Sequence, residues 1–302
     1  MRNTAVRLLC VVPFAALLLA AKAFTVSPDA QAAAVAVQTT KLADTLFMLE
    51  GKGGNIGVCV APDGVLMIDD EFADIAPQIQ SAIDALAPNA GAPKYLINTH
   101  FHGDHTGANA VFGKRALIVA HDSVRARLLD AKPEPMAPSG LPTVTFNAQL
   151  SLHHGAQELR LTHYPHAHTD GDVVVEFIGA NAWQLGDLFF NERFPFIDLS
   201  AGGSVDGLVA GVDDVLAKMS ATARIIPGHG APARKVDLER YRDMLVDCRR
   251  IVAAALAAGQ SREQIVAAKL LAPYDAWSWS FVSSDKFAHT LASSLTSAMA
   301  RK

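Results

Sequence analysis

Four side chains of types that commonly bind metal ions lie within the segment His100-Phe101-His102-Gly103-Asp104-His105. The segment directly follows the short apolar stretch Tyr95–Asn98, which is typical of a buried strand. Side chains two residues apart at the end of a strand point to the same side, so His100 and His102 can bind one ion. Asp104 and His105 follow where the chain must turn, and they can face a second ion. Because imidazole and carboxylate are ligands that suit zinc, the segment indicates a metal site rather than a solvated polar loop.

Further potential ligands stand near the ends of later strand-like stretches. His168 opens the segment His168-Thr169-Asp170-Gly171-Asp172, Asp187 follows Leu185-Gly186, and His229 lies in Pro227-Gly228-His229-Gly230. The glycines beside Asp187 and His229 would let the backbone approach the ions closely.

Other histidines compete for the same roles. His163 and His166 are alternatives to His168, but the Thr-Asp-Gly-Asp context after His168 favours that residue. The remaining histidines are more typical of surface or packing positions; they are His121, His153, His154 and His289.

Strand-like and helix-like stretches alternate from residue 44 onward, which indicates α/β layers. We expect strands at Leu46–Leu49, Ile56–Ala61, Val65–Ile68, Tyr95–Asn98, Leu117–Ala120, Val144–Phe146, Leu159–His163, Val173–Ile178, Trp183–Leu185 and Arg224–Ile226. We expect helices at Asp74–Leu86, Asp122–Leu129, Val205–Met219 and Leu238–Leu256, and a short one that begins with a capping box at Ser261. After Pro273 the pattern is mixed, and Trp277, Trp279 and Phe281 are expected to pack onto the main body.

The first 32 residues have the features of an export signal. Arg2 and Arg7 give a positive start, Leu8 to Ala21 is almost wholly apolar, and small residues near Ala23 and Ala32 offer cleavage sites. The apolar stretch is shorter than the roughly 20 residues that cross a bilayer, although a retained membrane anchor is the alternative. We predict a periplasmic or secreted protein with no stable membrane insertion after the signal is removed.

Composition narrows the possible partners. The net charge is -4, and no basic stripe is visible, so we expect no binding to nucleic acid. Cys59 and Cys248 are the cysteines that remain after removal of the signal. They could pair in an oxidising compartment, but their positions on apolar faces favour two buried free thiols.

The order of the ligand segments resembles that of the metallo-β-lactamase superfamily over roughly residues 40 to 258. The resemblance implies an α/β fold in the form of a four-layer αββα sandwich. This domain would span residues 33–258, after a signal peptide of residues 1–32 and before a short C-terminal helical extension of residues 259–302.

The resemblance also implies a role for each ligand at a site with two zinc ions per chain. The first ion would be bound by His100, His102 and His168, the second by Asp104, His105 and His229, with Asp187 bridging both. Asp104 and Asp187 are therefore the expected catalytic carboxylates. Asp69, at the end of Val65–Ile68, is expected to support the site, with helix capping as the alternative.

Lactamases of this family with a cysteine at the bridging position typically carry a lysine three residues later, which binds the carboxylate of the drug. This chain has Asp187 and Phe190 at those places, and an aspartate bridge resembles glyoxalase II and other esterase or thioesterase relatives. Phe190 and Asn191 are candidates for the substrate pocket, although Phe190 could instead belong to the core.

These features together predict a dinuclear zinc metallohydrolase. It would use a metal-bridging hydroxide to cleave an ester, thioester or lactam bond. Two zinc ions carry more positive charge than Asp104, Asp187 and a hydroxide offset, so the substrate is expected to be an anionic or carbonyl-rich small molecule. The alternatives are a dedicated β-lactamase, an iron-dependent sulfur oxidoreductase of the same fold, and a protein that binds metal without turnover.

Overall fold

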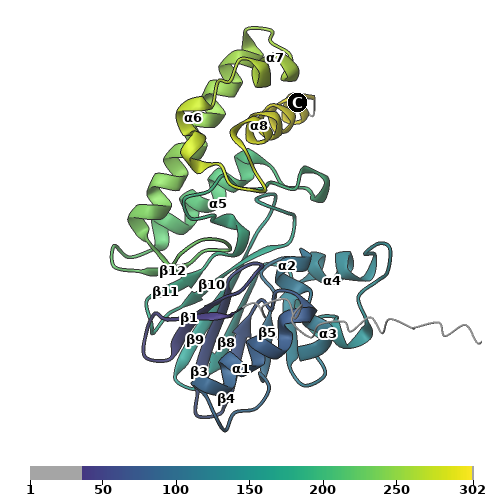
Figure 1. The fold of residues 1–302 in the computed structure, drawn as a ribbon, viewed down its shortest axis with the longest axis vertical. Helices are drawn as coiled ribbons and strands as arrows, with labels where there is room; N and C mark the ends of the chain where they lie inside the picture. Colours follow the sequence, from purple (N-terminus) through teal and green to yellow (C-terminus); the bar gives the residue numbers. More distant parts are fainter. Residues whose placement is uncertain (1–35, 301–302) are drawn as a thin grey trace, which may run out of the picture. The chain divides into compact units, whose positions relative to one another are not determined.

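A computed structural model describes residues 36–300 of the chain, and within them the first sheet has seven strands in the order β1-β2-β3-β4-β5-β6-β7 (Figure 1). The strands are β1 (Gln38–Lys41), β2 (Leu46–Glu50), β3 (Ile56–Ala61), β4 (Gly64–Ile68), β5 (Tyr95–Ile97), β6 (Leu117–His121) and β7 (Val144–Phe146). The strands β1 to β4 pair antiparallel, and β4 to β7 pair parallel.

The second sheet, in the same part of the chain, has six strands in the order β13-β12-β11-β10-β9-β8. They are β8 (Gln149–His154), β9 (Gln157–Tyr164), β10 (Asp172–Phe177), β11 (Ala182–Gln184), β12 (Arg224–Ile226) and β13 (Ala233–Arg234). Only β11 and β12 pair parallel, so their C-terminal ends lie at the same edge.

The described α-helices differ widely in length. They are α1 (Ala76–Leu86), α2 (Gly103–Thr106), α3 (Asn109–Phe112), α4 (Asp122–Leu129), α5 (Val205–Lys218), α6 (Lys235–Ala257), α7 (Arg262–Ala267) and α8 (Ser284–Ala300). In α6, the buried side chains Leu238, Tyr241, Leu245 and Cys248 recur every three or four residues, which places them on one face.

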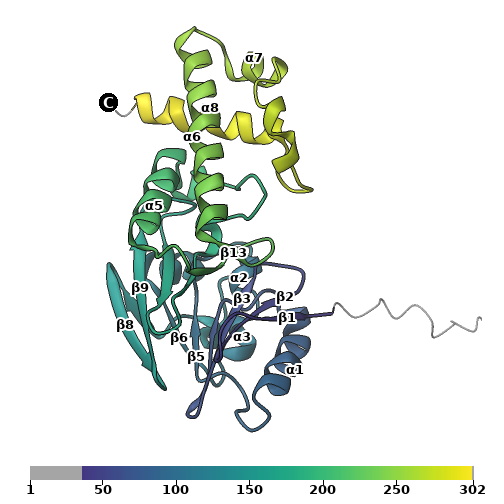
Figure 2. The same cartoon turned by 90° about the vertical axis from the view of Figure 1, so that its left-hand side faces the viewer.

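Strand alternation in the first sheet separates two hydrophobic cores. In β4, Leu66 and Ile68 face the second sheet, while Val65 and Met67 face α1. Successive side chains of a strand point to opposite faces, so one short strand contributes to both cores. Helix α1 therefore covers the outer face of this sheet (Figure 2).

The second sheet is buried in the same way. Val173 and Val175 of β10 lie in the core between the sheets, whereas Val174 belongs to a core shared with α5 and α6. Helices on both outer faces of two packed sheets make the four-layer αββα sandwich, and the predicted fold class is confirmed.

The C-terminal helices pack on the same side as α5 and α6. Ile265 of α7 and Phe287 and Leu291 of α8 are buried in the core that α6 also lines. The segment between α7 and α8 carries Trp277 and Trp279, which pack against that core as expected. The described residues, 36–300, fall within one compact unit.

The predicted strands and the longer helices are confirmed to within a few residues at their ends. The sequence patterns missed β1, β8, β13 and the full length of α8. The residues of β1 are all exposed, and none of them is apolar. In β8, at the other sheet's edge, only Leu150 and Leu152 alternate with polar residues, which is a short signal for a strand.

Residues 1–32, the predicted export signal, lie outside the described residues, so export stays a prediction. Among the helices of residues 36–300, none is both long and apolar enough to cross a membrane.

The two remaining cysteines are free and buried, as predicted from their positions on apolar faces. Cys59 lies in the core between the sheets, and Cys248 lies on the buried face of α6. Burial raises the pKa of the Cys59 thiol to about 11 and that of the Cys248 thiol to about 12. The reactive thiolate is therefore scarce at neutral pH, and reagents cannot reach it.

We expect the folded mature chain, residues 33–302, to react negligibly with Ellman's reagent at pH 8. After unfolding in guanidinium without reductant, two thiols per chain should react, because a protein that begins at residue 33 contains Cys59 and Cys248 but not Cys10. Rapid reaction of the native protein would contradict the burial. No reaction after unfolding would show that Cys59 and Cys248 are linked.

Candidate metal centre

The predicted ligands all lie at one edge of the sandwich, where strands of both sheets end. His100 and His102 follow β5, and Asp104 and His105 lie in α2. His168 lies in the loop after β9, Asp187 in a 3-10 turn after β11, and His229 in the loop after β12. The fold therefore brings together seven side chains that span about 130 residues of sequence.

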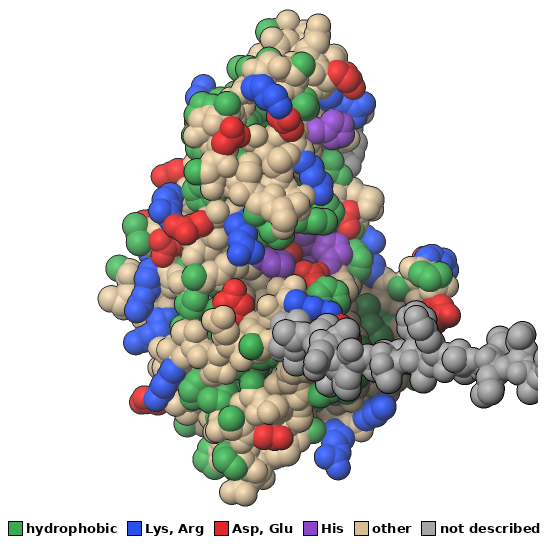
Figure 3. All heavy atoms as spheres, in the orientation of Figure 1, with side chains coloured by type: hydrophobic (Ala, Val, Ile, Leu, Met, Phe, Trp, Pro, Cys, Tyr) green, Lys and Arg blue, Asp and Glu red, His purple; other side chains and the backbone are tan. Residues whose placement is uncertain are grey.

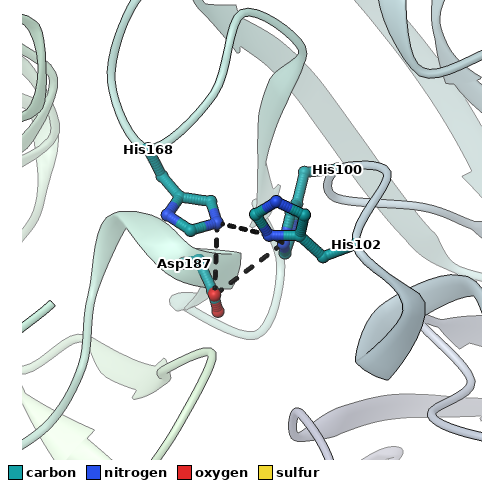
Figure 4. Close-up of side chains that lie close together, drawn as sticks. All are labelled: His100, His102, His168 and Asp187. Atoms are coloured by element: carbon teal, nitrogen blue, oxygen red, sulfur yellow. Dashed lines mark hydrogen bonds and ion pairs between the residues drawn. The ribbon is translucent and has the colours of Figure 1, made fainter. Parts of the chain in front are cut away.

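One cluster consists of His100, His102, His168 and one oxygen of Asp187, whose side chains point toward one another (Figure 4). His102 Nδ1 lies 3.1 Å from His100 Nε2 and 2.9 Å from His168 Nε2. The Oδ2 atom of Asp187 lies 3.7 Å from His100 Nε2 and 3.4 Å from His168 Nε2.

The second cluster consists of Asp104, His105 and His229, and it faces the other oxygen of Asp187. Asp187 Oδ1 lies 3.1 Å from His105 Nε2 and 3.4 Å from His229 Nε2. The Oδ2 atom of Asp104 lies 3.7 Å from His105 Nε2 and 3.3 Å from His229 Nε2. Asp187 is thus shared between the two clusters, one oxygen to each.

The spacing of these atoms fits metal ions. Ligand atoms placed tetrahedrally about 2.0–2.1 Å from a zinc ion lie about 3.3 Å from one another. The separations in both clusters range from 2.9 to 3.7 Å around this value. His105 Nε2 and Asp187 Oδ1 are also buried without a hydrogen-bond partner, which is costly unless a cation satisfies them.

Each imidazole of the first cluster is oriented by its other nitrogen. His100 Nδ1 lies 3.1 Å from Thr99 Oγ1, and His168 Nδ1 lies 2.7 Å from the carbonyl oxygen of Phe196. His102 Nε2 lies 3.1 Å from Asp198 Oδ2. Such partners fix the tautomer, so that the nitrogen facing the cluster can accept a metal. Asp198 follows no motif in the sequence, and sequence reasoning missed it.

Asp69 orients His105 in the same manner. It is fully buried, and its Oδ2 lies 2.8 Å from His105 Nδ1. Its other oxygen accepts the backbone N–H of Thr99 at 2.7 Å. Because the N-cap of the following 3-10 turn is Phe72, Asp69 supports the histidine and caps no helix.

Burial sets the protonation of the histidines in the first cluster. It lowers the pKa of His168 to about 4 and holds the pKa of His100 well below its usual value. Burial alone would raise the pKa of Asp187, but the surrounding imidazoles, His105 above all, hold it well below the usual range. His100 and His168 are therefore neutral imidazoles beside an ionised carboxylate, which are the forms that bind metals.

Close backbone approach explains the glycines around the ligands. A Cβ atom on Gly228 would lie 2.1 Å from Asp187 Oδ1, and one on Gly54 would lie 2.1 Å from His105 Cε1. No side chain fits at either place. Gly228, beside His229, thus lets the backbone come close to the Asp187 carboxylate, and close approach to an ion stays a prediction.

The competing histidines lie apart from both clusters. His163 stacks on His121 with ring centroids 3.5 Å apart, and its Nε2 is 2.9 Å from the carbonyl oxygen of Asp170. His166 Nδ1 is 3.1 Å from the carbonyl oxygen of Gly202. Of the three candidates in this region, only His168 lies in a group of side chains that could hold a metal ion.

A cavity of about 800 Å³ opens onto the ligands, and histidine, acidic and hydrophobic side chains meet on the corresponding face (Figure 3). Phe190 lines this cavity although it is only 1% exposed, and its ring stacks on His229 at 5.0 Å. Phe190 thus belongs both to the core and to the cavity wall. Beside it, the Asn191 side chain donates to the carbonyl oxygen of Ala231 at 2.9 Å and does not line the cavity.

Glu71 is a second residue that sequence reasoning missed. Its carboxylate accepts the backbone N–H groups of Gly51, Lys52 and Gly53 at 2.8, 2.9 and 2.7 Å. These residues form the loop between β2 and β3, which lines the cavity, and Glu71 itself has a φ of 54°. That backbone conformation is unfavourable for glutamate, and the three hydrogen bonds stabilise it.

The αββα sandwich of this chain, with histidine and aspartate clusters at one edge, is the arrangement of a class of metal-binding hydrolase folds. The family model described as the metallo-beta-lactamase superfamily matches residues 50–258, and the chain belongs to this superfamily. No curated protein matches the sequence significantly. The resemblance noted in the sequence is confirmed.

Solved structures show the same fold at low sequence identity. A metallo-β-lactamase from Pontibacter korlensis has a TM-score of 0.60 and 16% identity, covering 69% of this chain and 98% of that one. The DIM-1 metallo-β-lactamase has a TM-score of 0.60 and 16% identity, covering 70% and 98%. A stereoselective inverting sec-alkylsulfatase from Pseudomonas sp. has a TM-score of 0.67 and 12% identity, covering 85% and 50%.

Glu71→Gln should loosen the β2–β3 loop. The amide of glutamine keeps one acceptor oxygen but turns its NH₂ group toward backbone N–H groups of the loop. The N–H groups that lose their acceptor lower the free energy of unfolding by about 1–3 kcal/mol. Denaturant titration should show this loss, and hydrogen exchange should be faster at Gly51, Lys52 and Gly53 than in the wild type. Glu134→Gln, in an exposed loop, is the matched control and should change neither. Equal protection of the loop in both variants would show that Glu71 does not hold it.

Proposed function

We propose that this chain is a dinuclear zinc hydrolase that cleaves an ester, thioester or lactam bond of a small molecule. The observation that carries the proposal is the pair of ligand clusters that share the Asp187 carboxylate. Two ligand sets at tetrahedral spacing, joined by one carboxylate, suit two ions held close together.

The roles of the chain's own residues follow from their exposure. Zinc ions, when bound, would lower the pKa of water and polarise the bond to be cleaved. Asp187 is 5% exposed and would hold both clusters at a fixed separation. Asp104 is 29% exposed and lines the cavity, so its carboxylate could orient the attacking water and accept a proton at an oxygen. His229 and Phe190 would shield the centre from bulk solvent on one side.

The complete second cluster favours this proposal over an iron-dependent sulfur oxidoreductase. A mononuclear centre would use the first cluster alone, and His105, Asp104 and His229 would then have no metal to bind. A dedicated β-lactamase is the second candidate, since two of the structural neighbours are metallo-β-lactamases. It is less well supported, because Phe190 stands where a carboxylate-binding lysine would be needed.

Metal analysis tests the dinuclear site. The mature protein should hold close to two zinc ions per chain, and His229→Ala should hold close to one, because it removes a ligand of the second cluster only. Turnover should fall on the order of a hundredfold or more, since one charge that stabilises the transition state is lost. His289→Ala, at an exposed position on α8, should keep both ions and full activity. A wild-type stoichiometry of one that added zinc does not change would contradict the dinuclear proposal.

A hydrolysis screen tests the reaction class. Purified zinc-loaded protein should hydrolyse at least one of the ester, thioester, lactone or β-lactam probes, lose this activity on chelation and regain it with zinc. Phosphodiesters and sulfate esters belong in the same screen, the latter because a sec-alkylsulfatase shares the fold over 85% of this chain. No metal-dependent hydrolysis of any probe would leave a protein that binds metal without turnover. Turnover confined to β-lactams with low-micromolar KM would establish the lactamase alternative.

A further inference from the structure

The wall of the cavity is built largely from aromatic rings that lie in contact with one another. The ring centroids of Trp279 and Phe281 lie 5.6 Å apart, and those of Phe281 and Phe196 lie 5.4 Å apart. Trp279 also lies 5.8 Å from His229 and 6.1 Å from Phe190. A continuous apolar surface therefore runs from a metal-cluster histidine to the mouth of the cavity.

This wall is fixed in place by hydrogen bonds between two distant segments. The Phe194 N–H donates to the carbonyl oxygen of Trp277 at 2.8 Å, and Trp279 Nε1 donates to the carbonyl oxygen of Phe194 at 2.9 Å. The Trp279 N–H donates to the carbonyl oxygen of Val282, which is itself buried. Such anchoring lets Trp279 present a rigid face to a ligand at little cost in conformational entropy.

Phe281 is 51% exposed at the mouth of this cavity. A large exposed aromatic side chain that continues an apolar wall is typical of a surface that binds a ligand. Its neighbour Lys286 covers part of the ring, with Nζ 3.9 Å from the centroid. The exposed part of Phe281 is therefore a candidate contact for the far end of a bound molecule.

Arg193 provides a cation beside the aromatic wall. Its guanidinium lies 5.3 Å from the Trp279 ring, and it lines the cavity. Among the residues that the structure describes, no carboxylate forms an ion pair with Arg193, whereas Lys52, the other cation lining the cavity, is paired with Asp74. A half-buried guanidinium stacked on an aromatic ring is preorganised to bind an oxyanion through two N–H groups.

We propose that Trp279, Phe281 and Arg193 form a subsite for a substrate that combines an apolar, preferably aromatic, group with a carboxylate or sulfate. The apolar group would lie against Trp279 and Phe281, and the anion would pair with Arg193. The description of the ligand as a substrate rests on the proposed hydrolase function, but its binding to the subsite can be measured without turnover. It also supplies the anion-binding group that Phe190 cannot provide.

Calorimetric titration of the zinc-loaded protein with non-hydrolysable probes tests the subsite. 4-Phenylbutyrate should bind at least about tenfold more tightly than butyrate, which lacks the ring, and than 4-phenylbutanamide, which lacks the charge. Comparison with 3-phenylpropane-1-sulfonate, which mimics a sulfate but has no ester bond to cleave, identifies which oxyanion the subsite prefers. Equal binding of 4-phenylbutyrate and butyrate would overturn the aromatic part of the proposal.

Variants separate the subsite from direct binding to the metal. Arg193→Ala should weaken 4-phenylbutyrate about tenfold, leave the amide unaffected and retain both metals, and Arg193→Lys should restore part of the loss. Trp279→Ala should remove most of the preference for the phenyl group, and Trp279→Phe should keep part of it. Arg240→Ala is the matched control, because Arg240 also lies over a tryptophan, Trp277, but does not line the cavity.

Unchanged affinity in Arg193→Ala would mean that the carboxylate binds zinc alone, and the subsite would be wrong. If the binding pattern holds but no probe is hydrolysed, the subsite stands and the hydrolase proposal fails. If esters are hydrolysed but neither Arg193 nor Trp279 affects probe binding, the hydrolase proposal stands and the subsite fails.

Discussion

The two oxygens of Asp187 determine the geometry of the whole centre. Oδ2 faces His100 and His168, and Oδ1 faces His105 and His229, all within 3.7 Å. A carboxylate that is only 5% exposed is tolerated when cations or hydrogen-bond donors satisfy both oxygens. Oδ1 is buried without a hydrogen-bond partner, so positive charge is needed to stabilise it. One residue thereby couples the two clusters and fixes the distance between them.

The fold meets this demand by joining the ends of strands from both sheets. The Val173 N–H donates to the carbonyl oxygen of Thr99 at 2.7 Å, which ties the start of β10 to the segment after β5. The Gly228 N–H donates to the carbonyl oxygen of Gly186 at 2.8 Å, which holds the loops after β11 and β12 together. These backbone hydrogen bonds hold the segments that carry His100, Asp187 and His229 next to one another. Side chains on segments fixed in this way keep a narrow mutual geometry, as a metal site requires.

The sequence could predict those features that are encoded by neighbouring residues, and it could not predict contacts between residues far apart in the chain. Strands such as β4 and β10 carry continuous runs of apolar residues, and the ligand candidates from His100 to His105 stand in one contiguous motif. Asp198 lies 96 residues from the histidine that it orients, and neither it nor Glu71 belongs to a local pattern. Their roles appear only when the chain is folded, because hydrogen bonds between distant loops leave no period in the sequence.

The outer part of the aromatic wall and the predicted metal ligands come from different parts of the chain. The family model ends at residue 258, and all seven predicted ligands lie before that point. Trp279 and Phe281 lie after it, yet the hydrogen bonds of the Trp277 carbonyl and the Trp279 indole to the backbone of Phe194 hold this segment against the cavity. The family match thus covers both clusters that could hold metal ions, whereas Trp279 and Phe281 belong to a segment beyond it that lines the same cavity. Because the Trp279 ring lies 5.8 Å from the His229 ring, a substitution of Trp279 would change the cavity wall directly beside the second cluster.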